Sequence, residues 1–148
     1  MTKQRPIRTR SWLFTPATRP ERFAKASQAG ADVAILDLED AVAPGDKVRA
    51  RTTALDYLAD NPSDGALHAL RINGLDTRAG ISDLDALLGS EAAPDFLVLP
   101  KTETAGHLEI LDRLLTAAGK ATRLIGLIES ARGLAAVEAR RQRRGSQV

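Results

Sequence analysis

The sequence predicts an α/β fold with a parallel sheet, of the (β/α) TIM-barrel type but incomplete, with about five of the eight β/α units. Short apolar runs alternate with segments of helical spacing along the 148 residues, a pattern typical of right-handed strand-helix-strand crossovers. Polar side chains gather where several of these runs end, as they do at the active face of a barrel. A doubly wound open sheet is the alternative that five strands alone would favour, but no glycine-rich phosphate loop follows the first run.

The strands are predicted from short apolar runs that are rich in β-branched or aromatic residues and too short for helices. The run VAILDL is the clearest, because a nearly continuous apolar stretch is typical of a strand that is buried on both faces. The predicted strands are Ser11–Phe14, Val33–Leu38, Leu67–Ile72, Phe96–Leu99 and Leu124–Ile128.

The helices are predicted between these strands and after the last one. The first begins near Pro20, a residue that suits an initial helical turn, and ends at Gly30. The segment NPSDG has the composition of a loop and separates the second helix from the third strand. The other predicted helices are Lys47–Leu58, Ile81–Leu88, Ala105–Ala118 and a last one from about Ala131.

The composition excludes several classes of protein. The apolar fraction of 43% and the charged fraction of 27% are those of a globular chain. The absence of cysteine excludes disulfides and thiolate metal sites and fits a cytoplasmic location. No apolar run reaches the ~18 residues of a membrane helix, and the N-terminus lacks the apolar stretch of a secretory signal. We therefore expect a cytoplasmic protein without a membrane partner.

The net charge of +2 depends on four arginines near the C-terminus, Arg140, Arg141, Arg143 and Arg144. A nucleic-acid-binding protein would carry basic residues along one face together with stacking aromatics, and aromatics make up only 3% of this chain. We therefore expect no nucleic-acid partner.

Glu129 is a candidate metal ligand, because it ends an apolar run, LIGLIE, just before a small residue opens the next helix. A hard cation such as Mg²⁺ takes carboxylate oxygens and usually keeps several waters, so one or two such carboxylates suffice. A capping or salt-bridging glutamate is the alternative.

Arg71 and Lys101 are candidate substrate contacts at two other strand ends. Arg71 could grip a substrate carboxylate through two parallel hydrogen bonds, which lysine cannot imitate. An internal ion pair with Glu39 or Asp40 is equally open. Lys101 could hold an anionic substrate or pair with a neighbouring carboxylate, and the pairing is slightly favoured.

The segment LDLEDAV is the densest polar feature of the chain. Within a strand, Asp37 and Glu39 would share one face, and Asp40 would lie on the other face or in the turn. Acids packed at one strand end repel each other, so a metal or Arg71 is required nearby unless the segment is a solvated loop. The two histidines lack a spaced partner and are predicted to be ordinary strand and helix residues.

Together these segments resemble the citrate lyase beta subunit and its relatives, the HpcH/HpaI aldolase superfamily, which includes malyl-CoA and citramalyl-CoA lyases. The resemblance runs from about Arg10 to Glu138 and predicts one partial barrel domain over residues 1–139. It rests on several motifs in family order: RSWLFTPATRPERFAKA, ADVAILDLEDAVAPGDKVRAR, RING, DFLVLPKTET and LIGLIESARGL.

The resemblance implies a Mg²⁺-dependent carbon–carbon lyase that cleaves a 3-hydroxy acyl thioester, either citryl, malyl or citramalyl, on coenzyme A or an acyl carrier protein. It implies catalytic roles for Arg71, on the substrate carboxylate, and for Glu129, as the Mg²⁺ ligand that also contacts substrate. Lys101 would lie nearby in the substrate pocket, and Glu39 and Asp40 would act through bound waters.

The chain also departs from the family pattern. Pro16-Ala17 stands where the family usually has Pro-Gly, at a substrate or thioester contact. Residues 140–148 resemble nothing in the family and are expected to form a basic, disordered tail. The family's next strand would carry a second metal-binding aspartate. We therefore expect a shortened chain that self-associates, as a homo-oligomer or otherwise, and that binds Mg²⁺ and cleaves substrate weakly or not at all.

Two alternatives to a lyase remain open at this point. A non-catalytic remnant, or a binding module for an acyl thioester or organic acid, is favoured by Glu129 standing without a second acidic ligand. An open-sheet regulatory domain is the weaker alternative, and it predicts a stable monomer with covered sheet edges.

Overall fold

The computed structural model describes residues 9–61, 63 and 65–137, so the tail predicted at 140–148 lies outside the described residues. Within them, five parallel strands form one sheet in the order β1-β2-β3-β4-β5. Their bounds are β1 (Trp12–Pro16), β2 (Val33–Asp37), β3 (Leu67–Arg71), β4 (Phe96–Leu99) and β5 (Arg123–Gly126). The strand order follows the chain without reversal, as in a barrel, whereas a doubly wound sheet reverses at a switch point.

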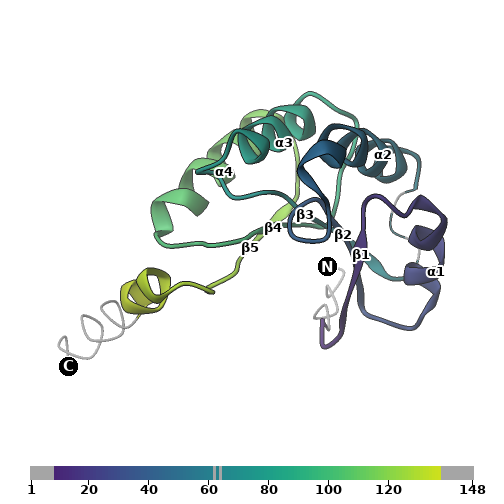
Figure 1. Cartoon of the computed structure of the whole chain (residues 1–148), viewed down its shortest axis with the longest axis horizontal. Coiled ribbons are helices and arrows are strands. Elements are labelled where there is room, and N and C mark those ends of the chain that lie inside the picture. Colours follow the sequence, from purple (N-terminus) through teal and green to yellow (C-terminus); the bar gives the residue numbers. More distant parts are fainter. Residues whose placement is uncertain (1–8, 62, 64, 138–148) are drawn as a thin grey trace, which may run out of the picture.

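A helical segment follows each of the five strands. Two 3₁₀ turns, η1 (Pro20–Arg22) and η2 (Pro44–Asp46), lead into helices, and residues 131–137 are helical after β5. Figure 1 shows α2, α3 and α4 side by side over one face of the sheet. The helices are α1 (Phe23–Gln28), α2 (Lys47–Asp60), α3 (Arg78–Leu88) and α4 (Ala105–Ala117).

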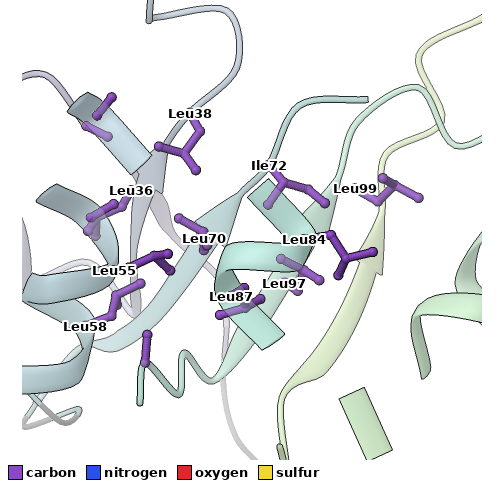
Figure 2. Close-up of a cluster of buried hydrophobic side chains, with 14 of the residues drawn as sticks. Leu36, Leu38, Leu55, Leu58, Leu70, Ile72, Leu84, Leu87, Leu97 and Leu99 are labelled. Atoms are coloured by element: carbon purple, nitrogen blue, oxygen red, sulfur yellow. The ribbon is translucent and has the colours of Figure 1, made fainter. Parts of the chain in front are cut away.

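The main core lies between the sheet and these helices (Figure 2). Alternate strand residues such as Leu36, Leu70 and Leu97 point to the helices, as the two-residue repeat of a strand requires. Leu58 of α2 and Leu87 of α3 belong to the same core and are almost fully buried. Burying each such side chain stabilises the fold by about 1.5–3 kcal/mol.

The opposite face of the sheet is also apolar, but among the described residues no helix covers it. It carries a second buried cluster that includes Ile35 and Val98. A hollow of about 340 Å³ opens on this face, and Phe14 in its wall is 48% exposed. The hollow is lined by Trp12, Phe14, Ile35, Val98, Ile125 and Leu127.

The predicted elements are all present, with shifted ends. β2 ends at Asp37 because the carboxylate of this residue accepts the N–H groups of Glu39 and Ala41, which curls the chain into a turn. α3 begins three residues before the predicted Ile81, because the Thr77 hydroxyl accepts the Gly80 N–H and caps the helix. Among the described residues, no helix has the length and apolarity to cross a membrane.

Candidate active site

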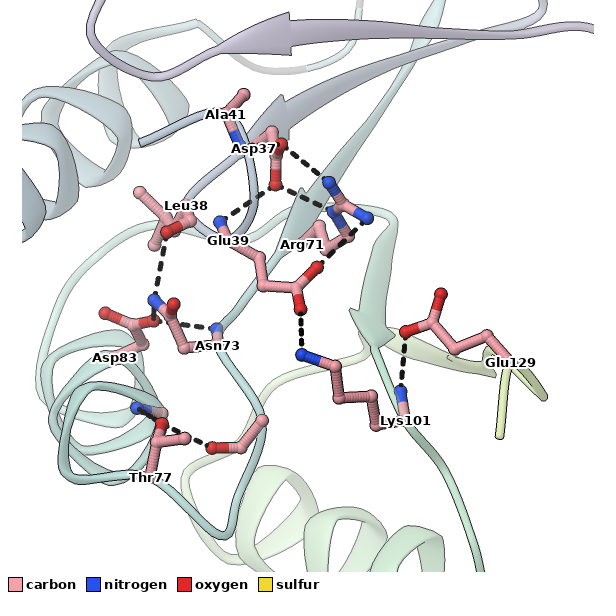
Figure 3. A network of polar contacts seen from close by, with 12 residues as sticks. Asp37, Leu38, Glu39, Ala41, Arg71, Asn73, Thr77, Asp83, Lys101 and Glu129 are labelled. Atoms are coloured by element: carbon pink, nitrogen blue, oxygen red, sulfur yellow. Dashed lines mark hydrogen bonds and ion pairs between the residues drawn. The ribbon is translucent and has the colours of Figure 1, made fainter. Parts of the chain in front are cut away.

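The polar residues at the carboxyl ends of β2, β3, β4 and β5 converge on one network of ion pairs and hydrogen bonds (Figure 3). Because parallel strands all end at the same edge of the sheet, side chains far apart in the sequence are brought together there.

Arg71 forms the centre of the network. Asp37 and Arg71 are directly paired in the β2–β3 register, and the Arg71 Nε and Nη2 atoms donate to the two Asp37 carboxylate oxygens, each at 2.7 Å. This hydrogen bond to Asp37 raises the pKa of Arg71 above its usual value, although burial opposes the shift. The guanidinium also lies 4.8 Å from the ring centroid of Phe14. Arg71 is thus held in one orientation by a two-pronged bond and an aromatic face.

Glu39 bridges the side chains of Arg71 and Lys101. Its Oε1 atom lies 3.0 Å from the Lys101 ammonium, and its Oε2 atom lies 3.1 Å from Arg71 Nη1. Glu39 is buried, and Oε2 accepts no hydrogen bond from the described residues. A buried carboxylate oxygen without a hydrogen bond costs stability, so this atom has capacity for one further donor such as a water.

The loop that carries Glu39 is fixed from two sides. The Lys47 ammonium, at the start of α2, donates to the carbonyls of Leu38 at 2.8 Å and Glu39 at 2.6 Å. The Asn73 side-chain amide also donates to the Leu38 carbonyl, at 3.0 Å, and in turn donates to Asp83 of α3, at 2.6 Å. The backbone around Glu39 is therefore anchored to α2, α3 and the end of β3.

Glu129 meets Lys101 at the end of β4. The Lys101 backbone N–H donates to Glu129 Oε1 at 2.9 Å, while the Lys101 side chain reaches back to Glu39. The hydrogen bond to Glu39 is the main cause that raises the pKa of Lys101 above its usual value. Lys101 thereby links the two carboxylates, one through its backbone and the other through its ammonium group.

The structure brings together four of the five predicted site residues: Arg71, Lys101, Glu129 and Glu39. Asp40 is exposed in the turn after β2 and contributes to the charge around Arg71 and Lys101 rather than to the hydrogen-bonded network of the described residues. The ion pair that the sequence left open for Arg71 is present, and Glu39 is one of its partners.

Asp37 was not predicted as a partner of Arg71, although compensation of the acidic cluster was. The available signal was the alignment of strand ends, because both residues close their strands and paired residues of a parallel sheet face the same side. Asp83 was also missed. Its signal was a carboxylate on the buried stripe of α3, where an acid must be paired.

Part of the network has the chemistry of a magnesium site. Glu129 is an exposed carboxylate with one oxygen engaged by Lys101, so it offers the hard oxygen ligand that Mg²⁺ prefers. No group of three or more His, Cys, Asp or Glu in the described part of the chain could hold a metal. These residues are compatible with a Mg²⁺ ion that would keep most of its shell as water or substrate oxygens and that Glu129 would hold.

Known proteins are similar to this chain over most of its length. A family model described as HpcH/HpaI aldolase/citrate lyase matches residues 10–141. The L-malyl-CoA/beta-methylmalyl-CoA lyase of Rhodobacter capsulatus is 41% identical over 137 residues, which cover 87% of this chain and 43% of the lyase.

Two solved structures are similar in fold and sequence. RipC from Yersinia pestis has a TM-score of 0.73 and 57% identity, over 90% of this chain and 53% of RipC. The citrate lyase beta subunit from Mycobacterium tuberculosis, complexed with oxaloacetate and magnesium, has a TM-score of 0.66 and 42% identity, over 84% of this chain and 49% of that chain. The chain spans about half the length of these solved proteins and 39–43% of the curated relatives.

Proposed function

Because the chain belongs to the HpcH/HpaI aldolase/citrate lyase family, we propose that it is a carbon–carbon lyase of the citrate lyase beta type, which cleaves a 3-hydroxy acyl thioester with Mg²⁺. The observation that carries the proposal is the network of Arg71, Glu39, Lys101 and Glu129, built from the ends of four strands. Such strand ends are where barrel enzymes keep their catalytic groups.

In this proposal Arg71 binds the substrate carboxylate. Its Nη1 atom makes no hydrogen bond to Asp37 and lies 3.1 Å from Glu39 Oε2, the oxygen that accepts no hydrogen bond from the described residues. Asp37 keeps the guanidinium plane fixed while substrate binds, which lowers the entropic cost of orienting the acid. Lys101 supplies a second positive charge toward an anionic substrate.

Glu129 is the proposed Mg²⁺ ligand, and Glu39 and Asp40 act on the ion through bound waters. When bound, Mg²⁺ supplies Lewis-acid polarisation of a carbonyl and stabilises developing enolate charge. The Lys101 N–H holds one oxygen of Glu129, and the other oxygen would be left for the ion. The solved relative that is complexed with oxaloacetate and magnesium supports magnesium as the ion.

The proposed substrate is a citryl, malyl or citramalyl thioester. Support comes from the malyl-CoA lyase of R. capsulatus and from the oxaloacetate complex of the M. tuberculosis protein. The test is incubation of the purified chain with each coenzyme A thioester and Mg²⁺, with chromatographic detection of the released thioester and oxo acid. Cleavage that Glu129→Gln abolishes would support the lyase, and Mg²⁺-independent cleavage would contradict it.

We expect turnover by the 148-residue chain to be weak or absent, because its described part offers Glu129 without a group of acidic ligands around it. The second candidate function is therefore a non-catalytic module that binds an organic acid or acyl thioester. Calorimetry with oxaloacetate separates the two: binding that requires Arg71, without cleavage of any thioester, would favour the module.

We also propose that the protein is cytoplasmic and self-associates.

A further inference from the structure

Lys101 has the only left-handed backbone among the non-glycine residues of the described part, with φ of 49°. L-residues avoid this region, because Cβ approaches the following carbonyl oxygen. Asparagine and aspartate relieve the strain with local hydrogen bonds of their short side chains, but a lysine side chain cannot. The Lys101 ammonium is instead directed away, to Glu39.

The neighbours of Lys101 hold the strained turn in place. The Thr102 N–H donates to the Leu127 carbonyl, the Leu127 N–H donates to the Leu99 carbonyl, and the Thr102 hydroxyl donates to that same Leu99 carbonyl, each at 2.9 Å. A Cβ atom at Gly133 would lie 2.7 Å from the Thr102 carbonyl oxygen, so the helix after β5 also presses against this turn. Strained residues persist where the surroundings fix them in this way, and they cluster at functional sites.

The strained residue carries a directed N–H group. The Lys101 N–H points across from β4 to Glu129 and donates to Oε1 at 2.9 Å, and the left-handed φ at the same residue turns the following chain toward the Thr102 contact with Leu127. We propose that Lys101 is a positioning residue, whose left-handed peptide orients the Glu129 carboxylate and leaves the second oxygen to face a divalent cation. The inference rests on the proposed metal role of Glu129 and adds the device that prepares this ligand. Groups that orient metal ligands commonly contribute about 10–100-fold to metal affinity.

Two substitutions separate the backbone from the side chain. Lys101→Gly and Lys101→Val both remove the ammonium, but glycine adopts the left-handed conformation freely, whereas β-branched valine resists it. We expect Lys101→Gly to bind Mg²⁺ as tightly as the unmodified chain or more tightly, since a nearby positive charge is removed. We expect Lys101→Val to bind about 10–100-fold more weakly. Equal affinities of the two variants in calorimetric titration with MgCl₂ would overturn the proposal.

A metal-independent measurement covers the cases in which Lys101→Val fails to fold or the unmodified chain binds no Mg²⁺. The Lys101 amide should exchange with solvent deuterium severalfold faster in Glu129→Ala than in the unmodified chain, because its acceptor is removed. An unchanged rate would overturn the positioning contact. Faster exchange together with no Mg²⁺ binding by the unmodified chain would instead contradict the metal role of Glu129 and leave the contact in place.

Discussion

The guanidinium of Arg71 shows why an arginine is needed at the end of β3. Its three nitrogens serve two carboxylates, the two oxygens of Asp37 and one of Glu39, in a site where the Asp37 side chain is 1% exposed. A lysine would supply the charge but not the rigid planar fork that matches both oxygens of Asp37. The residue therefore combines a structural pairing with the substrate contact that we propose.

Arg71→Lys should lower the free energy of unfolding by about 1–3 kcal/mol, because it leaves part of a buried carboxylate without donors. Urea denaturation followed by circular dichroism measures the loss. Arg49→Lys is the matched control, because the Arg49–Asp46 pair is exposed on α2 and should contribute less than about 1 kcal/mol. A loss no larger than that of the control would contradict the buried role of Arg71.

His68 should make stability depend on pH. Its ring is buried against α1, where Nε2 lies 3.1 Å from the Ser27 hydroxyl, and burial lowers the pKa of His68 below its ordinary value of 6.5 despite the opposing charge of Asp95. His68 therefore binds a proton more readily in the unfolded chain than in the folded chain. Its contribution to stability is fully present above the pKa of the unfolded state and is lost as the pH falls below that value. The urea concentration at the denaturation midpoint should decrease as the pH is lowered from about 7.5 to about 5.5. Ordinary carboxylates stay ionised over this range.

His68→Gln tests this origin, because glutamine keeps a polar side chain but does not titrate. The variant should lose most of the decrease in stability between about pH 7.5 and pH 5.5. The same pH dependence in the variant and in the unmodified chain would place its origin elsewhere.

At the scale of the elements, glycine sets how closely α3 approaches the loop after β3. A Cβ atom at Gly80 would lie 2.1 Å from the Gly74 carbonyl oxygen and 2.6 Å from that of Asn73. Gly80→Ala should therefore destabilise the fold by about 1–3 kcal/mol or more, since backbone rather than a flexible side chain must move. Gly45→Ala is the control, because nothing lies within 4 Å of its added Cβ. Equal thermal midpoints for the two variants would contradict this close packing.

The elements were predictable because their signals are local. The apolar runs, the helical spacing and the turn residues each identify a strand, helix or loop without knowledge of the rest of the chain. The ends were less predictable. The Asp37 carboxylate stops β2 by binding Glu39 and Ala41, and the Thr77 cap starts α3 early, and both effects depend on side-chain geometry that periodicity does not encode.

The site was predictable as a set of residues but not as a set of pairs. The positions of Arg71, Lys101 and Glu129 at strand ends indicated one shared edge, and the structure confirms that they meet there. The choice of Asp37 over Asp40 as the partner of Arg71 follows from the β2–β3 register. That register is a long-range property, as is the left-handed turn at Lys101, which is held by hydrogen bonds to Leu127, just after β5.

At the scale of the whole molecule, the uncovered face of the sheet is the dominant feature. Helices cover one face, while the other presents apolar side chains and a hollow of about 340 Å³. Within the described residues β1 and β5 each pair on one side only. Open strand edges and contiguous apolar patches are the usual sites of association. The 148-residue chain should therefore self-associate through this face.

Ile125→Lys on β5 tests the prediction, because it places a charge in the wall of the hollow. Light scattering after size-exclusion chromatography should show oligomers for the unmodified chain and a shift toward monomer for this variant. Val48→Lys is the control: Val48 is 69% exposed but lies on α2, on the helix-covered side, so its charge should leave the mass unchanged.

A disulfide between two copies can then report whether their strand edges meet, because the chain has no cysteine of its own. The two cysteines would be introduced as Leu13→Cys on β1 and Leu124→Cys on β5. A monomeric unmodified chain would contradict the prediction that this apolar face drives association.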